Sequence, residues 1–154
     1  MKNKYSKIKI NNDISYDGKL NNHEEYLKML NILETKCKFI GILAKHEIID
    51  RFKDDTICIE KTNSWWGIET SYTATIYYIK SSKELFKFLE KYETFCKYIF
   101  NNYRKTGMGD EVVITNFGTS DIAFFDKNDQ IILKTNTHEG FIIVNSSIDD
   151  LFTK

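Results

Sequence analysis

Apolar residues recur along the chain with two different periods. Between residues 22 and 36, Tyr26, Leu30 and Leu33 recur at spacings of three and four, as one face of a helix requires. Asn22 stands three residues before Glu25, which is a helix-capping pattern. We therefore predict a helix over residues 22–36.

A second stripe with helical spacing follows Ser81 and Glu84, which have the spacing of a capping box. The stripe consists of Leu85, Phe88, Leu89, Tyr92, Phe95, Cys96, Ile99 and Tyr103. This pattern predicts a long helix that starts near residue 81 and ends near Gly107.

Alternation with a period of two predicts strands elsewhere. The clearest case is residues 65–80, where Trp66, Ile68, Tyr72, Ala74, Ile76 and Tyr78 share the face expected to point to the core. Glu69, Ser71, Thr73 and Thr75 share the other face, expected to point to water. Weaker patterns predict strands at residues 5–10, 39–44 and 56–61, and residues 46–52 fit a short helical turn.

The last third of the chain consists of short apolar runs separated by turn residues. We predict strands at residues 111–117, 121–125, 130–135 and 141–144, then a short amphipathic tail from Ser147. Sequential strands with short connections favour antiparallel pairing. The predicted fold class is therefore α+β, a single domain of residues 1–154 whose mainly antiparallel sheet carries two principal helices on one face.

Composition narrows the class of protein. The 154 residues include 22 basic and 22 acidic side chains, so the formal net charge is zero. Arginine occurs only at positions 51 and 104, which argues against recognition of phosphates or guanine. We expect neither direct nucleic-acid binding nor membrane binding, because both favour a basic excess.

Cys37, Cys58 and Cys96 are widely spaced and form no CxxC pair, as is typical of reduced thiols. The N-terminal residues lack an apolar stretch of signal-peptide length, and the longest apolar run, residues 39–44, is too short to span a bilayer. We expect a cytoplasmic protein.

No motif predicts a reaction. His23 and His46 each precede a glutamate but lack the second histidine of HExxH, so we expect no metal site. The three cysteines fall in apolar patterns without a partner that would stabilise a thiolate. Gly107-Met-Gly109 follows a predicted helix, the reverse of a dinucleotide-binding loop. We therefore expect no cofactor and no catalytic residue.

Charge is uneven along the chain. Residues 1–20 carry five Lys against two Asp, for +3, and residues 21–109 carry fourteen basic against twelve acidic residues, for +2. Residues 110–154 carry three Lys against eight acids, for −5. An acidic surface attracts a basic partner and accelerates its association.

Two aromatic residues, Trp65 and Tyr77, fall on the polar face of the predicted strand 65–80, where exposed aromatic side chains are typical anchors for a protein partner. Together with nearby acidic residues they define our expected partner-binding set. It comprises Trp65, Glu69, Tyr77, Asp121, Asp126, Asp129, His138 and Glu139.

Residues 65–144 resemble the small immunity proteins of bacterial contact-dependent inhibition and other polymorphic toxin systems. The likeness lies in the long alternating strand, the capped aromatic helix, Gly109-Asp-Glu111, Asp121-Ile122 and residues 137–140 (Thr-His-Glu-Gly). It implies a non-enzymatic inhibitor that binds a cognate toxin domain, such as a nuclease. A basic toxin surface would complement the acidic last third, and the inhibitor itself is expected to be a monomer or small homo-oligomer.

Two alternatives remain open at this point. One is a small hydrolase-like enzyme with a site at Asp121, His138 and Glu139, which are acidic and imidazole groups from one end of the predicted sheet. The other is a regulatory domain that binds a small ligand beneath its helices.

Overall fold

The computed structural model of the chain describes residues 5–9, 22–44, 46–101, 110–115, 121–136 and 141–153. Its helices are α1 (His23–Lys36), α2 (Glu47–Arg51), α3 (Lys83–Leu89) and α4 (Ser146–Thr153), with a 3-10 turn, η1 (Lys53–Asp55). Its strands are β1 (Tyr5–Lys9), β2 (Phe39–Leu43), β3 (Thr56–Trp65), β4 (Ile68–Lys80), β5 (Cys96–Asn101), β6 (Asp110–Thr115), β7 (Ile122–Phe125), β8 (Ile131–Asn136) and β9 (Phe141–Asn145).

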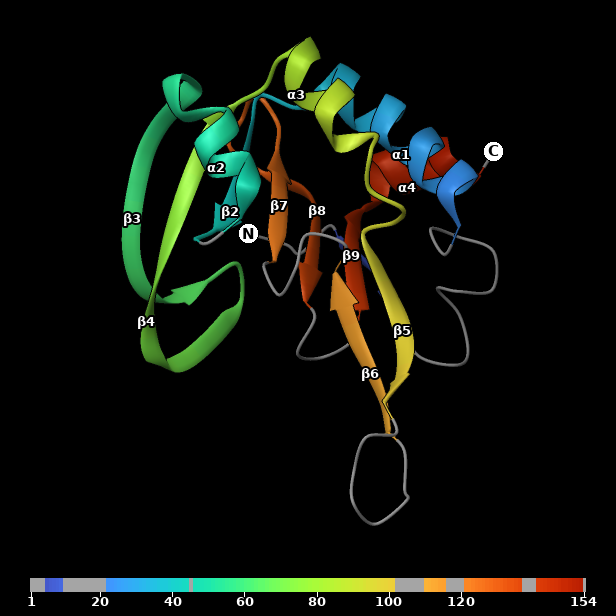
Figure 1. Cartoon of the computed structure of the whole chain (residues 1–154). Helices are drawn as coiled ribbons and strands as arrows, with labels where there is room; N and C mark the ends of the chain where they lie inside the picture. The colour runs from blue at the N-terminus through green and yellow to red at the C-terminus, as the bar shows by residue number, and fades with distance from the viewer. Residues whose placement is uncertain are drawn as a thin grey trace.

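Seven strands form one sheet in the order β1-β9-β8-β7-β2-β4-β3, and every neighbouring pair is antiparallel. Strands β5 and β6 pair only with each other in the described part of the chain. Helices α1, α3 and α4 lie together, away from the curved β3–β4 hairpin (Figure 1). The predicted α+β class with a mainly antiparallel sheet is confirmed.

The helices pack on one face of the sheet, which we call the helix face. Alternation along β2 directs Ile40 and Ile42 to this face, where both are fully buried. The sheet supplies further core residues there, and every α-helix contributes apolar side chains. The helical contribution comprises Tyr26, Met29, Leu30, Leu33, Ile48, Leu85, Phe86, Leu89, Ile148 and Phe152.

Helix α1 forms where the sequence predicts it. The Asn22 side chain accepts a hydrogen bond from the backbone N–H of Glu25 at 2.8 Å, which satisfies one of the free donors at the helix start. The second capping site is shifted by one residue, because Ser82 rather than Ser81 accepts from the N–H of Leu85.

The long helix predicted over residues 81–107 is wrong beyond Leu89. The chain tightens there through i to i+3 bonds, such as Tyr92 N–H to the carbonyl of Leu89, and residues 96–101 form β5. The hydroxyl of Tyr26 on α1 also donates to the Leu89 carbonyl. Phe95 remains buried after the turn, with its ring centroid 4.8 Å from that of Tyr26, so the stripe predicted the burial of Phe95 correctly but placed it in the wrong element.

The strand predicted over residues 65–80 is interrupted at its start. Trp66 and Gly67 form the turn of the β3–β4 hairpin with positive φ angles of 50° and 87°. The register then breaks, because Thr62 pairs with Ala74 and Ser64 pairs with Glu69. This break leaves Tyr72, expected in the core, 61% exposed.

Replacing Tyr26 tests the junction between α1 and α3. Tyr26→Phe removes one of the two hydrogen bonds to the Leu89 carbonyl, which keeps the Tyr92 N–H, and we expect it to lower the free energy of unfolding by about 0.5–1.5 kcal/mol. Exposed Tyr72→Phe is the matched control and is expected to change it by less than about 0.5 kcal/mol. Urea denaturation measures both, and equal values for the two variants would contradict a structural role for the Tyr26 hydroxyl.

Candidate functional site

The face of the sheet opposite the helices, here called the hairpin face, carries a cluster of aromatic rings. Register places Phe39 of β2 beside Phe125 of β7, and Gly41 beside Tyr78 of β4. The rings of Phe39 and Phe125 stack with centroids 4.7 Å apart, and Tyr78 lies edge-on to each at 5.8 Å. Such mutual packing holds the three rings as a rigid apolar floor.

A bulge in β3 turns this floor into a pocket. Thr56 pairs with Ile79 and Cys58 pairs with Tyr78, so Ile57 has no partner on β4 and adds one residue to β3. Ile57 and Cys58 consequently both line the pocket, which has a volume of about 240 Å³. Phe39, Tyr78, Phe125 and Asp129 complete its lining.

Asp129 is the charged residue of this lining, and a tight turn places it there. The Asp126 carboxylate accepts hydrogen bonds from the N–H groups of Asn128 and Gln130 at 2.8 and 3.0 Å. Asp129 itself has a φ of 61°, a left-handed conformation that aspartate tolerates better than most residues. Its carboxylate lies 3.4 Å from the Lys38 ammonium, but both side chains are largely exposed, so a partner's cation can compete with this weak ion pair.

A second carboxylate adjoins the pocket at Tyr78. The Tyr78 hydroxyl donates to the Glu60 carboxylate at 3.1 Å. Burial, above all, raises the pKa of Tyr78, so the ring stays neutral and acts as a donor. The pocket therefore combines aromatic surface with acidic groups contributed by β3 and by the turn between β7 and β8.

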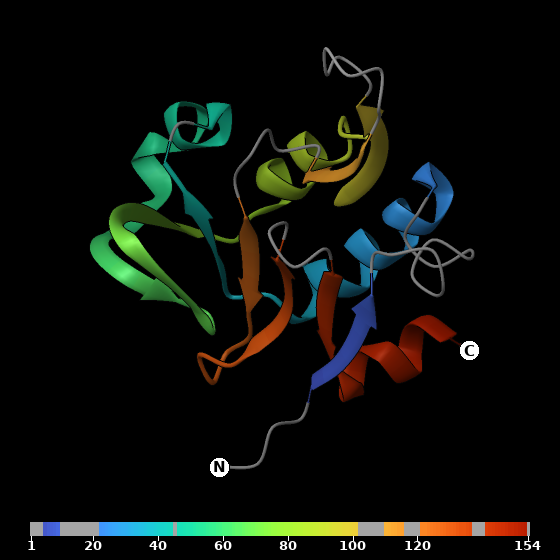
Figure 2. The same ribbon diagram turned by 90° about the horizontal axis from the view of Figure 1, so that it is seen from below.

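The tip of the β3–β4 hairpin packs beside the pocket, against one of its rings, Phe125. It curves back toward β2 and β7, as Figure 2 shows, and the Trp66 ring lies edge-on to Phe125 at 6.4 Å. A Cβ on Gly41 would stand 2.7 Å from the Trp66 ring, so only glycine permits this approach. Lys134 of β8 donates a hydrogen bond to the Trp66 carbonyl, and its burial lowers its pKa.

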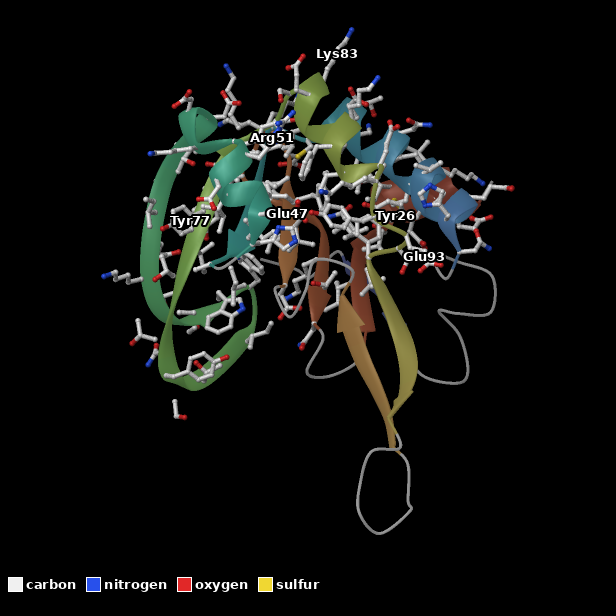
Figure 3. All side chains as sticks on the ribbon, in the orientation of Figure 1. Tyr26, Glu47, Arg51, Tyr77, Lys83 and Glu93 are labelled. Carbon is white, nitrogen blue, oxygen red and sulfur yellow. The ribbon has the colours of Figure 1, made fainter. Side chains whose placement is uncertain are left out.

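A second cavity, of about 460 Å³, lies beside α2 and is lined by Ala44, His46, Glu47, Ile49, Asp50 and Tyr77. Figure 3 shows Glu47 on α2 and Tyr77 on β4, which line it from two elements. The Nδ1 atom of His46 accepts from the N–H of Ile48 at 3.1 Å and so caps α2. Burial is the main reason that the pKa of His46 is lowered, which favours the neutral ring that this cap requires.

The structure separates the residues expected to bind a partner. Trp65 is 5% exposed and does not offer the aromatic surface that alternation predicts. Tyr77 is half-buried against the core of the helix face instead of pointing to water. Glu69 is exposed at the hairpin tip, as expected.

The acidic residues of the expected set also lie apart. Asp126 and Asp129 form the turn beside the aromatic pocket. Asp121 is buried at the other end of β7, where it accepts a hydrogen bond from the Thr135 hydroxyl at 2.9 Å. His138 and Glu139, expected to join Asp121, lie outside the described residues.

Sequence reasoning missed five of the pocket residues: Phe39, Ile57, Cys58, Tyr78 and Phe125. One available signal was Gly67, because a glycine between two alternating runs is typical of a hairpin turn. The bulge at Ile57 cannot be recognised in the sequence, because nothing in a run of alternating residues shows which residue will be left without a partner on the neighbouring strand.

Among the described residues, no group of three or more His, Cys, Asp or Glu side chains is arranged to hold a metal ion. Within the same part of the chain, none of the helices has the length and apolar character needed to cross a membrane. Comparison of the chain with protein-family models, with curated protein sequences and with solved structures finds no match.

Cys37 and Cys58 are expected to differ in reactivity. Cys58 is exposed at the pocket, whereas burial raises the pKa of Cys37 to about 12. In a Cys96→Ser background at pH 8, we expect iodoacetamide to label Cys58 at least about 100-fold faster than Cys37, with Cys37 labelling rising about tenfold per pH unit. Peptide mass spectrometry measures both rates, and equal rates at pH 8 would show that Cys37 is open to solvent.

Proposed function

We propose that the chain is a non-enzymatic cytoplasmic immunity protein, and that the aromatic pocket on the hairpin face is where a cognate toxin domain docks. The observation that carries the proposal is the pocket itself, which is lined by the exposed Ile57, by three packed aromatic rings and by Asp129. Recognition surfaces commonly join an aromatic centre to a charged rim in this way.

The surroundings of the pocket support a protein partner. Ile57 and Tyr72 of the β3–β4 hairpin are 54% and 61% exposed, and exposed apolar side chains on one element favour an interaction surface. Asp129 and Glu60 suit a basic partner, in agreement with the −5 charge of residues 110–154. The resemblance of residues 65–144 to immunity proteins supports a toxin as that partner.

A protection assay tests the role. If the product of the adjacent upstream gene carries a toxic C-terminal domain, co-expression of this chain is expected to restore growth, and the two proteins are expected to form a stable one-to-one complex. Growth arrest that continues at equal expression of the chain would remove the immunity role.

Two isoleucines of β3 offer a matched pair for testing the docking surface. Ile57 and Ile59 have nearly equal exposure, but only Ile57 lines the pocket, whereas Ile59 pairs with Tyr77, on the other face. Ile57→Glu places a carboxylate among apolar groups, and we expect it to weaken the complex at least about tenfold, while Ile59→Glu changes affinity less than about threefold.

Calorimetric titration of the toxin domain with each variant measures these affinities. Circular dichroism first checks that both variants keep the fold of the parent protein. Equal weakening by the two substitutions would contradict docking at the pocket, even if the chain protects cells.

The cavity beside α2 favours a second candidate, the binding of a small polar ligand. It is the larger of the two cavities described, and it joins the carboxylates of Glu47 and Asp50 to the Tyr77 ring. Screening small organic cations by thermal shift tests this role. A rise in melting temperature that a cation causes in the parent protein but not in Asp50→Asn would support ligand binding in this cavity. The lack of any rise with every cation would rule it out.

A further inference from the structure

The tip of the β3–β4 hairpin, residues 64–69, is joined to the rest of the hairpin through a break in the ladder. Thr62 pairs with Ala74, whereas Ser64 pairs with Glu69, so residues 70–73 stand opposite Asn63 alone. The tip is therefore a separate ladder of two pairs, Ser64 with Glu69 and Trp65 with Ile68. Three surplus residues in one strand allow the tip to turn relative to the sheet without breaking the longer ladder.

Two contacts hold the tip against the hairpin face. The Trp66 ring lies over Gly41 and edge-on to Phe125. The Lys134 ammonium donates a hydrogen bond to the Trp66 carbonyl. Both contacts centre on one turn residue, so they are gained and lost together.

One feature of the same tip opposes this closed position. The indole N–H of Trp65 is buried and has no hydrogen-bond partner among the described residues. Lifting the tip would let water satisfy this donor, which lowers the cost of opening.

We propose that the tip is a flap that opens about residues 63 and 70–73, and that the seat it vacates on Gly41 and Phe125 receives an aromatic side chain of the protein partner. The closed structure argues for an aromatic occupant, because the seat already fits an indole, that of Trp66. The use of this seat by a partner rests on the proposed function, whereas the opening of the flap does not. Lifting the flap would extend the pocket floor along β2, from Phe39 to Gly41.

Hydrogen exchange measures the opening. We expect the indole N–H of Trp65, which is buried without a hydrogen-bond partner, to exchange faster than the amides of Ile40 and Phe124 in the central strands, because the tip opens without global unfolding. Lys134→Met removes the bond to Trp66 and is expected to raise exchange at the tip about tenfold. Lys38→Met removes only an exposed ion pair and is the matched control, expected to leave the tip unchanged.

Indole serves as the probe for the vacated seat, followed by the amide chemical shifts of Gly41 and Phe125. Because only the open form binds, the apparent affinity is proportional to its population. Lys134→Met is therefore expected to strengthen indole binding by the same factor by which it accelerates exchange. Gly41→Ala separates the opening of the flap from binding at the seat. Its methyl group pushes Trp66 away, so exchange at the tip is expected to rise, and it also fills the seat, so indole binding is expected to be lost.

Each outcome decides the proposal. The proposal is supported if Lys134→Met raises the exchange rate at the tip and the affinity for indole by the same factor. It also requires that Gly41→Ala raises the exchange rate but abolishes indole binding. A Trp65 indole N–H that exchanges at the rate of the Ile40 and Phe124 amides in every variant would overturn the flap. Faster exchange without tighter indole binding would overturn the seat. None of these results depends on the protection assay, so failure of the immunity role is recognised separately.

Discussion

The approach of the Trp66 indole to the bare backbone of Gly41 determines the shape of the hairpin face. A glycine in the middle of a strand costs about 0.5–1 kcal/mol relative to alanine, and β2 is a central strand of the sheet. This cost is offset because the Trp66 ring at the tip of the hairpin can pack over Gly41 and against Phe125. The aromatic pocket lies beside this contact and is floored by Phe39, Tyr78 and Phe125.

The two faces of the sheet divide stability from recognition. On the helix face, α1, α3 and α4 bury a continuous core, and Tyr26 links two helices through both its ring and its hydroxyl. On the hairpin face, aromatic groups pack among themselves but keep a surface open to solvent. Side chains such as Ile57 contribute little to the core, so this surface can change its specificity while the fold stays intact.

Local patterns predicted helices and strands correctly where the apolar spacing and the boundary residues indicated the same element. Residues 22–36 combine a capping residue with an apolar stripe at helical spacing, and α1 indeed spans His23–Lys36. The strands predicted at residues 121–125 and 130–135 were confirmed as β7 and β8, because the turn residues 126–129 mark their shared boundary. The helix past Leu89 failed because aromatic and β-branched residues of 96–101 satisfy a helical spacing by coincidence and favour pairing with β6. The pocket could not be predicted, since it depends on a bulge and a register break that exchange the faces of whole segments.

The pairing of β1 with β9 has a consequence for how the protein is made. These strands come from residues 5–9 and 141–145, so β1 must wait until β9 has been made before it finds its neighbour. Strands β2, β4 and β3 are complete by residue 80 and can pair first, β7 and β8 can add to them in turn, and β1 joins only after β9. Vectorial synthesis thus gives the hairpin side of the sheet a head start over the side that ends in β1.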